Sequence, residues 1–409
     1  MITPLTRRSL LLAAGTPLFG AAARPRIAAI VTEYRLNSHA DVIVGRLLGG
    51  YHYDGERRAP AVQVVSMYTD QTPANDMSRG LSAKYGFPIH KTVREALTLG
   101  GTKLAVDGVI LIGEHGDYPN NEKGQKLYPR YELYKQIVEV FRDSRGAVPL
   151  FTDKHLSVDW ERAKWMYDQS RRLRFPLLAG SSLPVTWRRP PLEIPLGSAV
   201  RHAVATFYGG KEAYGFHALE TLQCMVERRK GGETGIAAVR CMEGPEVWAW
   251  TDGNAWAPPL LEAALTQTAS RKPGSPRDNV KQPILFDLEY RDGLRAAVYL
   301  LNGHVQQAAF ATMLDGRTAA TQIWLQSGRP YSHFSALVRN IEVLITTRRA
   351  PYPCERTLLT TGALAALMDS SFQKNTRLAT PHLAVRYQAP RESVFTRGPE
   401  PALEDKPLA

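Results

Sequence analysis

The chain has 409 residues, of which 44% are hydrophobic and 22% charged, and its formal net charge is +12. A chain of this length exceeds the size at which one hydrophobic core usually splits, so we expect two domains. Three cysteines without metal-site spacing exclude a disulfide framework, and scattered rather than clustered basic residues argue against a nucleic-acid-binding protein.

The first residues have the features of an export signal. Thr6–Leu12 reads T-R-R-S-L-L-L, a short apolar run continues to Phe19, and Ala21-Ala22-Ala23 follows as a small-residue cleavage site. We therefore expect a twin-arginine signal peptide over residues 1–23 and a periplasmic or secreted protein. The alternative is a Sec signal with an incidental arginine pair. The apolar run is too short to span a bilayer.

Residues 24–185 alternate between buried strands and amphipathic helices. The predicted strands are Arg26–Val31, Val62–Tyr68, Val106–Ile112, Val148–Phe151 and Phe175–Ala179, and the predicted helices are Asp41–Leu48, Met77–Tyr85, Val93–Thr98, Tyr131–Asp143 and Trp160–Arg172. Such alternation predicts an α/β domain with a doubly wound, Rossmann-like parallel sheet. Two polar stretches, Gly49–Pro60 and Gly113–Arg130, interrupt it as loops.

Polar side chains stand where the predicted strands end. Asp153-Lys154-His155 follows the strand at Val148–Phe151, and Glu114-His115 follows the strand at Val106–Ile112. Ligands in open α/β sheets bind at the carboxyl ends of the strands, so these residues are candidates for a site. The alternative is solvated turns without chemistry, and the spacing around Glu114 is weak evidence for a metal.

Residues 186–389 show a different pattern and predict an α+β domain. Thr186–Pro195 resembles a linker, and Tyr214–Glu227 and Leu358–Ser371 are predicted helices. Asp292-Gly293 and Asp315-Gly316 each separate two β-rich runs, which predicts two hairpins in an open, mostly antiparallel sheet. Residues 390–409 are expected to form a loose tail. Trp248, Trp250 and Trp256 are candidates for sugar stacking or for an aromatic core strand.

The order of these elements and several phrases resemble the Gfo/Idh/MocA superfamily of sugar and polyol oxidoreductases. The similar phrases are Ala83-Lys84-Tyr85-Gly86, Val106–Ile110, Asp153-Lys154-His155-Leu156 in place of Glu-Lys-Pro-Leu, Gly209-Gly210 through His217, the hairpin at Asp292-Gly293 and the helix at Glu355–Ser370. They extend over most of the chain beyond residue 23.

The resemblance implies binding of NAD or NADP and hydride transfer to or from a carbon of a sugar-like substrate. By position, Lys154 matches the lysine that polarises the reacting oxygen and His217 matches the histidine that exchanges its proton. Glu220, three residues later, matches a common acidic position. Asp70 would hold a ribose hydroxyl. A proton acceptor near neutrality suits an alcohol that loses hydride.

The sequence departs from the family at two positions. Residues 32–38, T-E-Y-R-L-N-S, contain no glycine where dinucleotide-binding folds bring backbone close to the pyrophosphate. Arg35, Asn37 and Ser38, with Glu114, are then the candidate cofactor contacts. Ala213 stands where the family has an aspartate four residues before the histidine.

The leading hypothesis is an exported NAD(P)-linked oxidoreductase that acts on a small sugar or polyol, with a possible homo-oligomer through the antiparallel sheet. The first alternative keeps the fold without classical redox activity, as a sugar-binding protein, a lyase or a glycosidase. A secreted structural or interaction protein is the second. The sequence indicates neither nucleic acid nor metal as a ligand.

Overall fold

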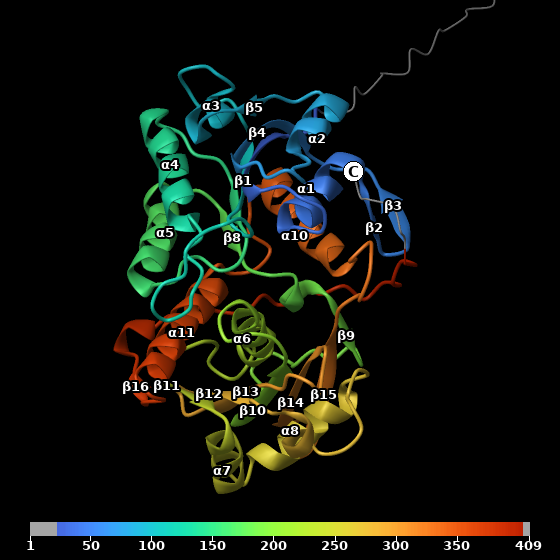
Figure 1. Cartoon of the computed structure of the whole chain (residues 1–409), viewed down its shortest axis with the longest axis vertical. Coiled ribbons are helices and arrows are strands. Elements are labelled where there is room, and N and C mark those ends of the chain that lie inside the picture. Colours follow the sequence, from blue (N-terminus) through green and yellow to red (C-terminus); the bar gives the residue numbers. More distant parts are fainter. Residues whose placement is uncertain (1–22, 404–409) are drawn as a thin grey trace, which may run out of the picture.

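The sheet of the first domain contains six parallel strands in the order β5-β4-β1-β6-β7-β8 (Figure 1). This computed structural model describes residues 23–403. The strands are β1 (Arg26–Glu33), β4 (Gln63–Gln71), β5 (Ile89–His90), β6 (Gly108–Ile112), β7 (Leu150–Thr152) and β8 (Leu177–Ala179). Strand order reverses between β1 and β6, and such switch points are where α/β folds bind ligands. The predicted doubly wound sheet is confirmed.

Helices cover both faces of this sheet. One face carries α1 (His39–Gly49), α2 (Ser78–Tyr85) and α10 (His333–Thr347), and the other carries α3 (Val93–Thr98), α4 (Arg130–Asp143) and α5 (Trp160–Arg172). The helix α10 lies beside α1, although it comes late in the chain (Figure 1). Residues 333–347 thus pack with the first domain, whereas the sequence had placed them in the second. The apolar face of α10 is needed to cover the face of the sheet on which α1 and α2 pack.

The second domain is built on an eight-stranded sheet in the order β16-β11-β12-β13-β10-β14-β15-β9. Its strands are β9 (Trp187–Arg189), β10 (His202–Phe207), β11 (Ile236–Glu243), β12 (Ile284–Tyr290), β13 (Arg295–Leu300), β14 (Ala308–Leu314), β15 (Arg317–Trp324) and β16 (Leu378–Ala379). All neighbours pair antiparallel except β10 and β13. Both predicted hairpins, β12–β13 and β14–β15, are confirmed.

The second sheet is also covered on both faces. The long helices α6 (Ala213–Val226) and α11 (Glu355–Phe372) pack on one side, and α7 (Pro245–Gly253) and α8 (Ala257–Gln267) pack on the other. Both faces of this sheet are therefore occupied by helices of the same chain. The tryptophans Trp248 and Trp250 lie on α7, and Trp256 precedes α8, so the expected aromatic core strand is wrong.

Three further sequence expectations are corrected. The expected linker contains β9, which pairs with β15, because its side chains complete the edge of the second sheet. The expected loop at Gly49–Pro60 contains the small hairpin of β2 (Tyr51–Tyr53) and β3 (Glu56–Arg58). The tail is packed over residues 390–403: Phe395 is buried and the indole nitrogen of Trp187 donates to Gly398 O at 2.6 Å.

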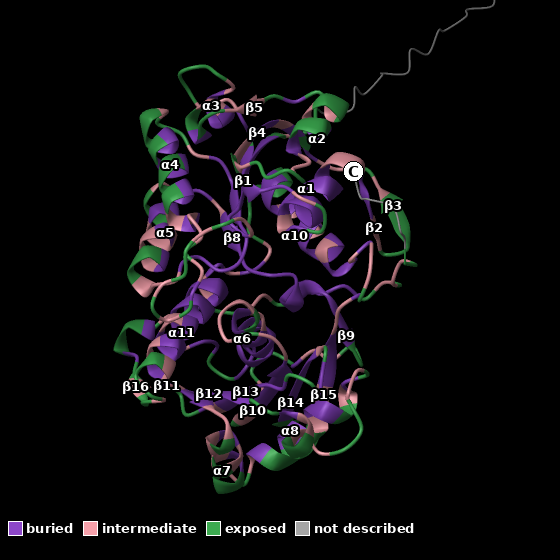
Figure 2. Ribbon diagram, in the orientation of Figure 1, coloured by how far each residue is buried: buried purple, intermediate pink, exposed green. Residues whose placement is uncertain are grey.

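Remaining short elements are α9 (Pro276–Asn279), η1 (Leu183–Val185) and η2 (Pro381–Leu383). Buried residues concentrate in the two sheets and on the helix faces that touch them, and exposed residues lie on the outer helix faces (Figure 2). Within residues 23–403 no helix is long and apolar enough to cross a bilayer. The predicted signal peptide falls, apart from Ala23, outside the described residues, as do the last residues of the predicted tail, 404–409.

Candidate active site

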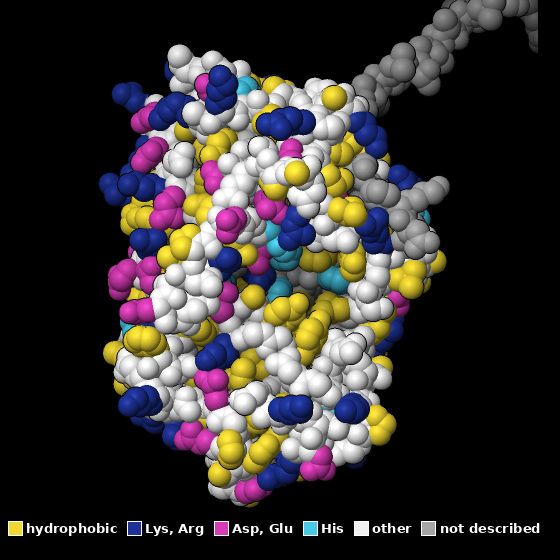
Figure 3. Space-filling view, viewed as in Figure 1, with side chains coloured by type: hydrophobic (Ala, Val, Ile, Leu, Met, Phe, Trp, Pro, Cys, Tyr) yellow, Lys and Arg dark blue, Asp and Glu magenta, His cyan; other side chains and the backbone are white. Residues whose placement is uncertain are grey.

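A cleft separates the two domains at the carboxyl ends of β1, β6 and β7. Figure 3 shows it as a hollow in the middle of the molecule with histidine side chains along its upper wall. The residues that enter it follow directly from the ends of these strands, from the start of α1 and from the start of α6. Because parallel strands end at one edge of the sheet, segments that are distant in the sequence meet here.

A buried ion cluster lies at the end of β6. Glu114 pairs with Arg130 at 2.5 Å between Oε2 and Nη2, and with Lys154 at 3.3 Å between Oε1 and Nζ. All three side chains are less than 10% exposed. Burial alone would raise the pKa of Glu114, but the charges of Lys154 and Arg130 hold it well below its ordinary value. Glu114 is therefore the ionised anchor of the two cations.

The polar excursion between β6 and α4 supplies both ends of this cluster. Glu114 stands at its start and Arg130, the first residue of α4, at its end. In between, Lys123 pairs with Asp369 of α11, so the excursion crosses from the first domain to the second. The segment between β6 and α4 is therefore ordered and positions two buried charges.

A histidine–aspartate pair stands next to the ion cluster. His39, the first residue of α1, places Nδ1 2.6 Å from Oδ2 of Asp153, which follows β7 and is 1% exposed. The other carboxylate oxygen of Asp153 is buried and has no hydrogen-bond partner in the described part of the chain. His39 also borders an open cavity, so its Nε2 is the ring nitrogen left for a ligand. A buried carboxylate behind an imidazole orients the ring and stabilises its protonated form.

Lys154 and His217 come to the same part of the cleft. Lys154 Nζ donates to the carbonyl oxygen of Ala213 at 3.2 Å, in the first turn of α6, and His217 lies one turn further along that helix. Burial lowers the pKa of His217 well below its ordinary value, and the charge of Lys154 lowers it further. The Nδ1 atom of His217 is buried without a partner.

Further imidazoles line this region in their neutral form. Burial lowers the pKa of His115 to about 4 and that of His333 to about 3. Burial likewise holds the pKa of His155 well below its ordinary value. One ring nitrogen of each, His115 Nε2, His155 Nδ1 and His333 Nδ1, has no hydrogen-bond partner within the described residues. Buried polar groups are normally paired, so these atoms indicate a site built for a ligand.

Glu220 does not join this cluster. Its Oε2 accepts from the backbone nitrogen and the hydroxyl of Ser181 at 2.7 and 2.9 Å, and its Oε1 accepts from the hydroxyl of Thr357 at 2.8 Å. Burial raises the pKa of Glu220. The side chain thus ties α6 to α11 and to the segment after β8.

The glycine-free turn after β1 is closed by its own side chains. Ser38 caps α1 by accepting from the backbone nitrogen of Asp41, and the backbone nitrogen of Asn37 donates to the Asp41 carboxylate at 2.9 Å. Arg35 pairs with Glu33 at 2.5 Å and contacts His115 Nδ1 at 3.3 Å. Two carboxylates, Glu33 and Asp41, therefore flank the helix N-terminus that dinucleotide folds offer to a pyrophosphate.

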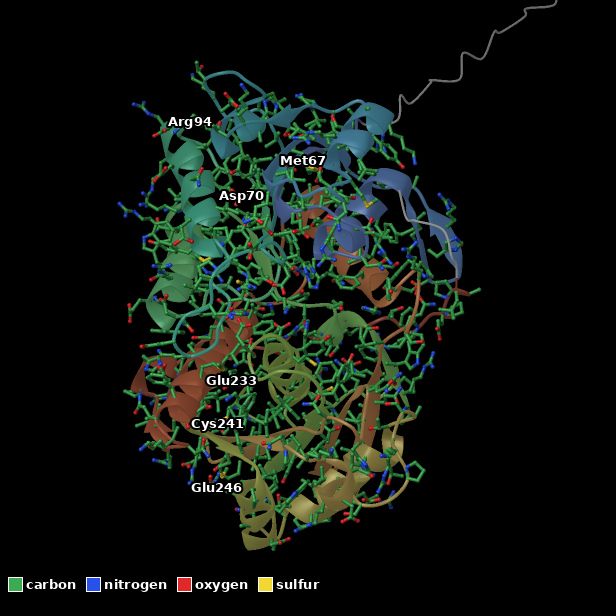
Figure 4. The ribbon with its side chains drawn as sticks, in the orientation of Figure 1. Met67, Asp70, Arg94, Glu233, Cys241 and Glu246 are labelled. Carbon is green, nitrogen blue, oxygen red and sulfur yellow. The ribbon has the colours of Figure 1, made fainter. Side chains whose placement is uncertain are left out.

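Asp70 is likewise occupied. Its two carboxylate oxygens accept from the hydroxyls of Tyr68 at 2.7 Å and Tyr118 at 2.6 Å. Figure 4 labels Asp70 in the first domain, near β4. It lies at the carboxyl end of that strand, as predicted, but its oxygens are already bonded to the protein.

A cavity of about 510 Å³ opens beside His39. Aromatic and imidazole rings line one part of this cavity: His39, His115, Tyr208, Tyr331, His333 and Phe334. Amide and hydroxyl side chains line another part: Asn37, Ser270, Gln306, Gln307, Gln326 and Ser327. The aliphatic side chains of Val42 and Leu325 complete the lining. A larger cavity of about 810 Å³ lies at the opposite, amino end of β8 and contains none of this cluster. The active-site candidate is therefore the smaller one.

Sequence reasoning found Lys154, His217, Glu114 and Asp153 and missed His39 and Arg130 as members of the site. The cluster Asp153-Lys154-His155 gave a signal for Asp153, but its partner His39 lies 114 positions earlier. Among residues 23–403 no group of three or more His, Cys, Asp and Glu side chains is placed to hold a metal ion.

No protein-family model and no curated protein matches the sequence. Solved structures do match the fold. GenD2 from gentamicin A biosynthesis in complex with NAD has a TM-score of 0.54 and 11% identity, over 92% of this chain and 99% of that one. The myo-inositol 2-dehydrogenase from Lactobacillus plantarum has a TM-score of 0.51 and 10% identity, over 87% and 99%.

The apo scyllo-inositol dehydrogenase from Lactobacillus casei is similar over 87% of this chain and 98% of its own, with a TM-score of 0.50 and 10% identity. These similarities extend across both domains. At such identities they establish architecture and leave chemistry to the site. The chain has the Gfo/Idh/MocA-like fold, an N-terminal parallel sheet with helices followed by a mostly antiparallel sheet.

Proposed function

We propose that this chain is an exported, oxidoreductase-like enzyme that moves a proton to or from a hydroxyl of a sugar or polyol in the cleft between its domains. The observation that carries the proposal is the pair of His39 and Asp153, 2.6 Å apart, at the edge of a cavity and beside Lys154. An imidazole oriented by a buried carboxylate has the geometry of a general base.

Each residue has a separate task in this proposal. His39 Nε2 takes the proton of a substrate hydroxyl, and Asp153 stabilises the imidazolium that results. Lys154, held by Glu114, donates a hydrogen bond to the oxygen that gains negative charge. His217, neutral because of burial, is a second group able to donate to or accept from that oxygen. Glu220 has no part, since both its oxygens are bonded elsewhere.

The fold neighbours favour a nicotinamide dinucleotide as the hydride carrier. GenD2 was solved with NAD, and two other neighbours are named inositol dehydrogenases. The residues present do not fit the usual pose of that cofactor. Glu33 and Asp41 flank the start of α1, Ser38 caps it, and Asp70 is bonded to two tyrosines. We therefore assign no step to a dinucleotide.

The same observations favour a second candidate, an acid–base enzyme of this fold that uses no dinucleotide, such as a lyase or a glycosidase. Elimination and hydrolysis both need a proton donor and a proton acceptor on one substrate, which the His39–Asp153 pair and Lys154 would supply. The two candidates share the substrate class and the proton-transfer residues and differ only in the hydride.

Release of cofactor separates the two candidates. The exported protein is purified and denatured, and the supernatant is searched by mass spectrometry for nicotinamide dinucleotides; the native protein is then titrated with NADH and NADPH by calorimetry. Released cofactor, or heat of binding at micromolar concentration, supports the redox form. An empty release without heat up to millimolar cofactor overturns it and leaves the acid–base form.

Export is tested by replacing Arg7 and Arg8 together with lysine. Twin-arginine export depends on the arginine pair and carries folded proteins, so the variant should fold and remain in the cytoplasm. The readout is fractionation followed by melting of the retained protein. Undiminished periplasmic protein would show that export follows another route.

A further inference from the structure

The cavity beside His39 lies against the start of α1, the place that dinucleotide folds reserve for a pyrophosphate. Its walls have a composition that does not suit an anion. None of its lining residues is Asp, Glu, Lys or Arg; all are amides, hydroxyls, imidazoles, aromatic rings or aliphatic side chains. A volume of about 510 Å³ is within the range of small-molecule sites, roughly 300–1,000 Å³.

Three polar atoms on this wall are buried and have no hydrogen-bond partner among residues 23–403: Gln307 Oε1, His115 Nε2 and His333 Nδ1. They come from three separate segments, the stretch before β14, the excursion after β6 and the start of α10. His333 is only 8% exposed. An unpaired buried donor or acceptor is costly, so three that border one cavity indicate ligand groups that complete them.

The chemistry of these atoms narrows the ligand. Gln307 Oε1 is an acceptor and requires a donor from the ligand. The two imidazoles are neutral, because burial lowers their pKa values to about 4 and about 3. Arg35 donates to Nδ1 of His115, so Nε2 of that ring carries the hydrogen and donates, whereas Nδ1 of His333 accepts or donates one hydrogen bond. A hydroxyl group both donates and accepts without bringing charge, so the hydroxyls of one ligand can satisfy all three positions.

The surroundings of the cavity oppose an anion. The backbone nitrogen of Asn37, a lining residue, donates to the carboxylate of Asp41, whose other oxygen is buried and unpaired. Arg35, the nearest cation to His115, is neutralised by Glu33 at 2.5 Å. A pyrophosphate at this helix start would meet the carboxylates of Glu33 and Asp41, while Arg35 is paired with Glu33 and Arg329 donates to Asn37 Oδ1 at 3.2 Å. Aromatic edges from Phe334 and Tyr331 offer apolar contact instead.

We infer that this cavity is a binding subsite for an uncharged, hydroxyl-rich ring, a sugar or cyclitol unit, seated where related folds hold a pyrophosphate. The inference rests on the proposed function for its substrate class and adds the place and the charge of the ligand. His39, at the edge of the cavity, is then in reach of a hydroxyl of the bound ring.

Two substitutions at Gln307 distinguish a neutral ligand from an anion. Gln307→Leu removes the acceptor, and Gln307→Glu keeps an acceptor but adds a negative charge. If the ligand is a neutral ring, Gln307→Leu should weaken its binding by about tenfold, the effect of one lost buried hydrogen bond. The affinity of Gln307→Glu for such a ring should stay close to that of the wild type. For a pyrophosphate the order reverses, because a carboxylate beside a phosphate repels it.

The measurement is calorimetry on the full chain with myo-inositol and cellobiose as neutral probes and glucuronate and NADH as charged ones. Matched controls are Gln136→Leu and Gln136→Glu on the exposed side of α4, which should bind like the wild type. The expected result is binding of a neutral probe, weakened by Gln307→Leu and little changed by Gln307→Glu.

Three outcomes overturn the subsite: NADH binding that Gln307→Glu abolishes, neutral binding that neither variant changes, or no binding of either neutral probe at millimolar concentration. A different set of results would reject the proposed function. Neutral binding that depends on Gln307 without turnover of any sugar would retain the subsite and reject the enzyme. Turnover that depends on His39 but not on Gln307 would do the reverse.

Discussion

Two buried polar regions of this protein contrast in how completely their carboxylates are paired. In the second domain Glu227 accepts from Arg356 at 2.6 and 2.8 Å and from Tyr387, and Glu233 accepts from Arg229 and Gln223. Figure 4 labels Glu233 in that domain. In the cleft one oxygen of Asp153 and several imidazole nitrogens remain without partners.

The contrast separates buried polar groups that stabilise the fold from buried polar groups that are available to a ligand. A buried carboxylate whose oxygens accept from the protein, as those of Glu227 do, fixes the packing of α6 against α11 and leaves no oxygen for a ligand. A buried polar atom left open is costly to the fold and persists where a ligand completes it. Substitutions in the two regions should therefore affect different measurements.

The largest effect is expected in the cleft. Replacing His39 with alanine, or Asp153 with asparagine, should lower turnover of the sugar or polyol substrate by about 10²–10⁴-fold, because the general base or its orienting carboxylate is lost. Asp153→Asn should also shift the pH profile of kcat/KM. His382→Ala, a histidine on η2, serves as the control and should retain activity. Near wild-type turnover in His39→Ala would reject its role as the base.

The second effect concerns stability of the paired region. Arg356→Met leaves Glu227 buried with one partner fewer and should lower the free energy of unfolding by about 3–5 kcal/mol. Urea denaturation measures it. The double variant Arg356→Met with Glu227→Gln should regain part of the loss, because no charge is then stranded. A loss under 1 kcal/mol, on the order of a surface ion pair, would show that this network is not structural.

Lys154→Ala and His217→Ala should each remove most turnover, about 10²-fold, with modest changes of melting temperature. A group that acts mainly in the transition state contributes to rate more than to folding. Differential scanning calorimetry beside the activity assay separates the two. If one of the two variants unfolds, the replaced residue contributes to folding rather than to catalysis.

A smaller effect is expected from pH. Burial, with the charges of Arg46 and His39, lowers the pKa of His333 to about 3, against about 6.5 when unfolded. Between these values the unfolded state binds a proton that the folded state does not, so stability falls as pH decreases below about 6.5. From pH 6.5 to 5 this one group should cost about 1.6 kcal/mol. His333→Asn should remove that part of the slope in urea titrations, and an unchanged slope would contradict it.

The smallest effect tests Glu220, which the family resemblance made a catalytic candidate. Glu220→Gln weakens bonds from Ser181 and Thr357 and should lower stability by about 1 kcal/mol while turnover stays near the wild type. Denaturation and activity are measured on the same preparation. A large loss of turnover in a folded Glu220→Gln protein would show that full pairing does not mark a structural residue.

The sequence alone determined the elements whose signals are local. Apolar runs of a few residues define five of the six strands of the first sheet, all but the short edge strand β5, because each run depends only on neighbours within one strand. Three-to-four spacing defines α5 and Asp-Gly pairs define both hairpins for the same reason. The position of Lys154 at a strand end followed from the same local pattern, and so did the fold resemblance.

Tertiary structure decided which of these residues meet. His39 and Asp153 are 114 positions apart, Asp70 is captured by Tyr118 from another segment, and α10 returns from the second domain to cover the first sheet. Glu220 lies one turn from His217 on α6, yet it faces Ser181 and Thr357 because α11 packs there. Periodicity tells which face of a helix is buried, and only the topology tells what lies against that face.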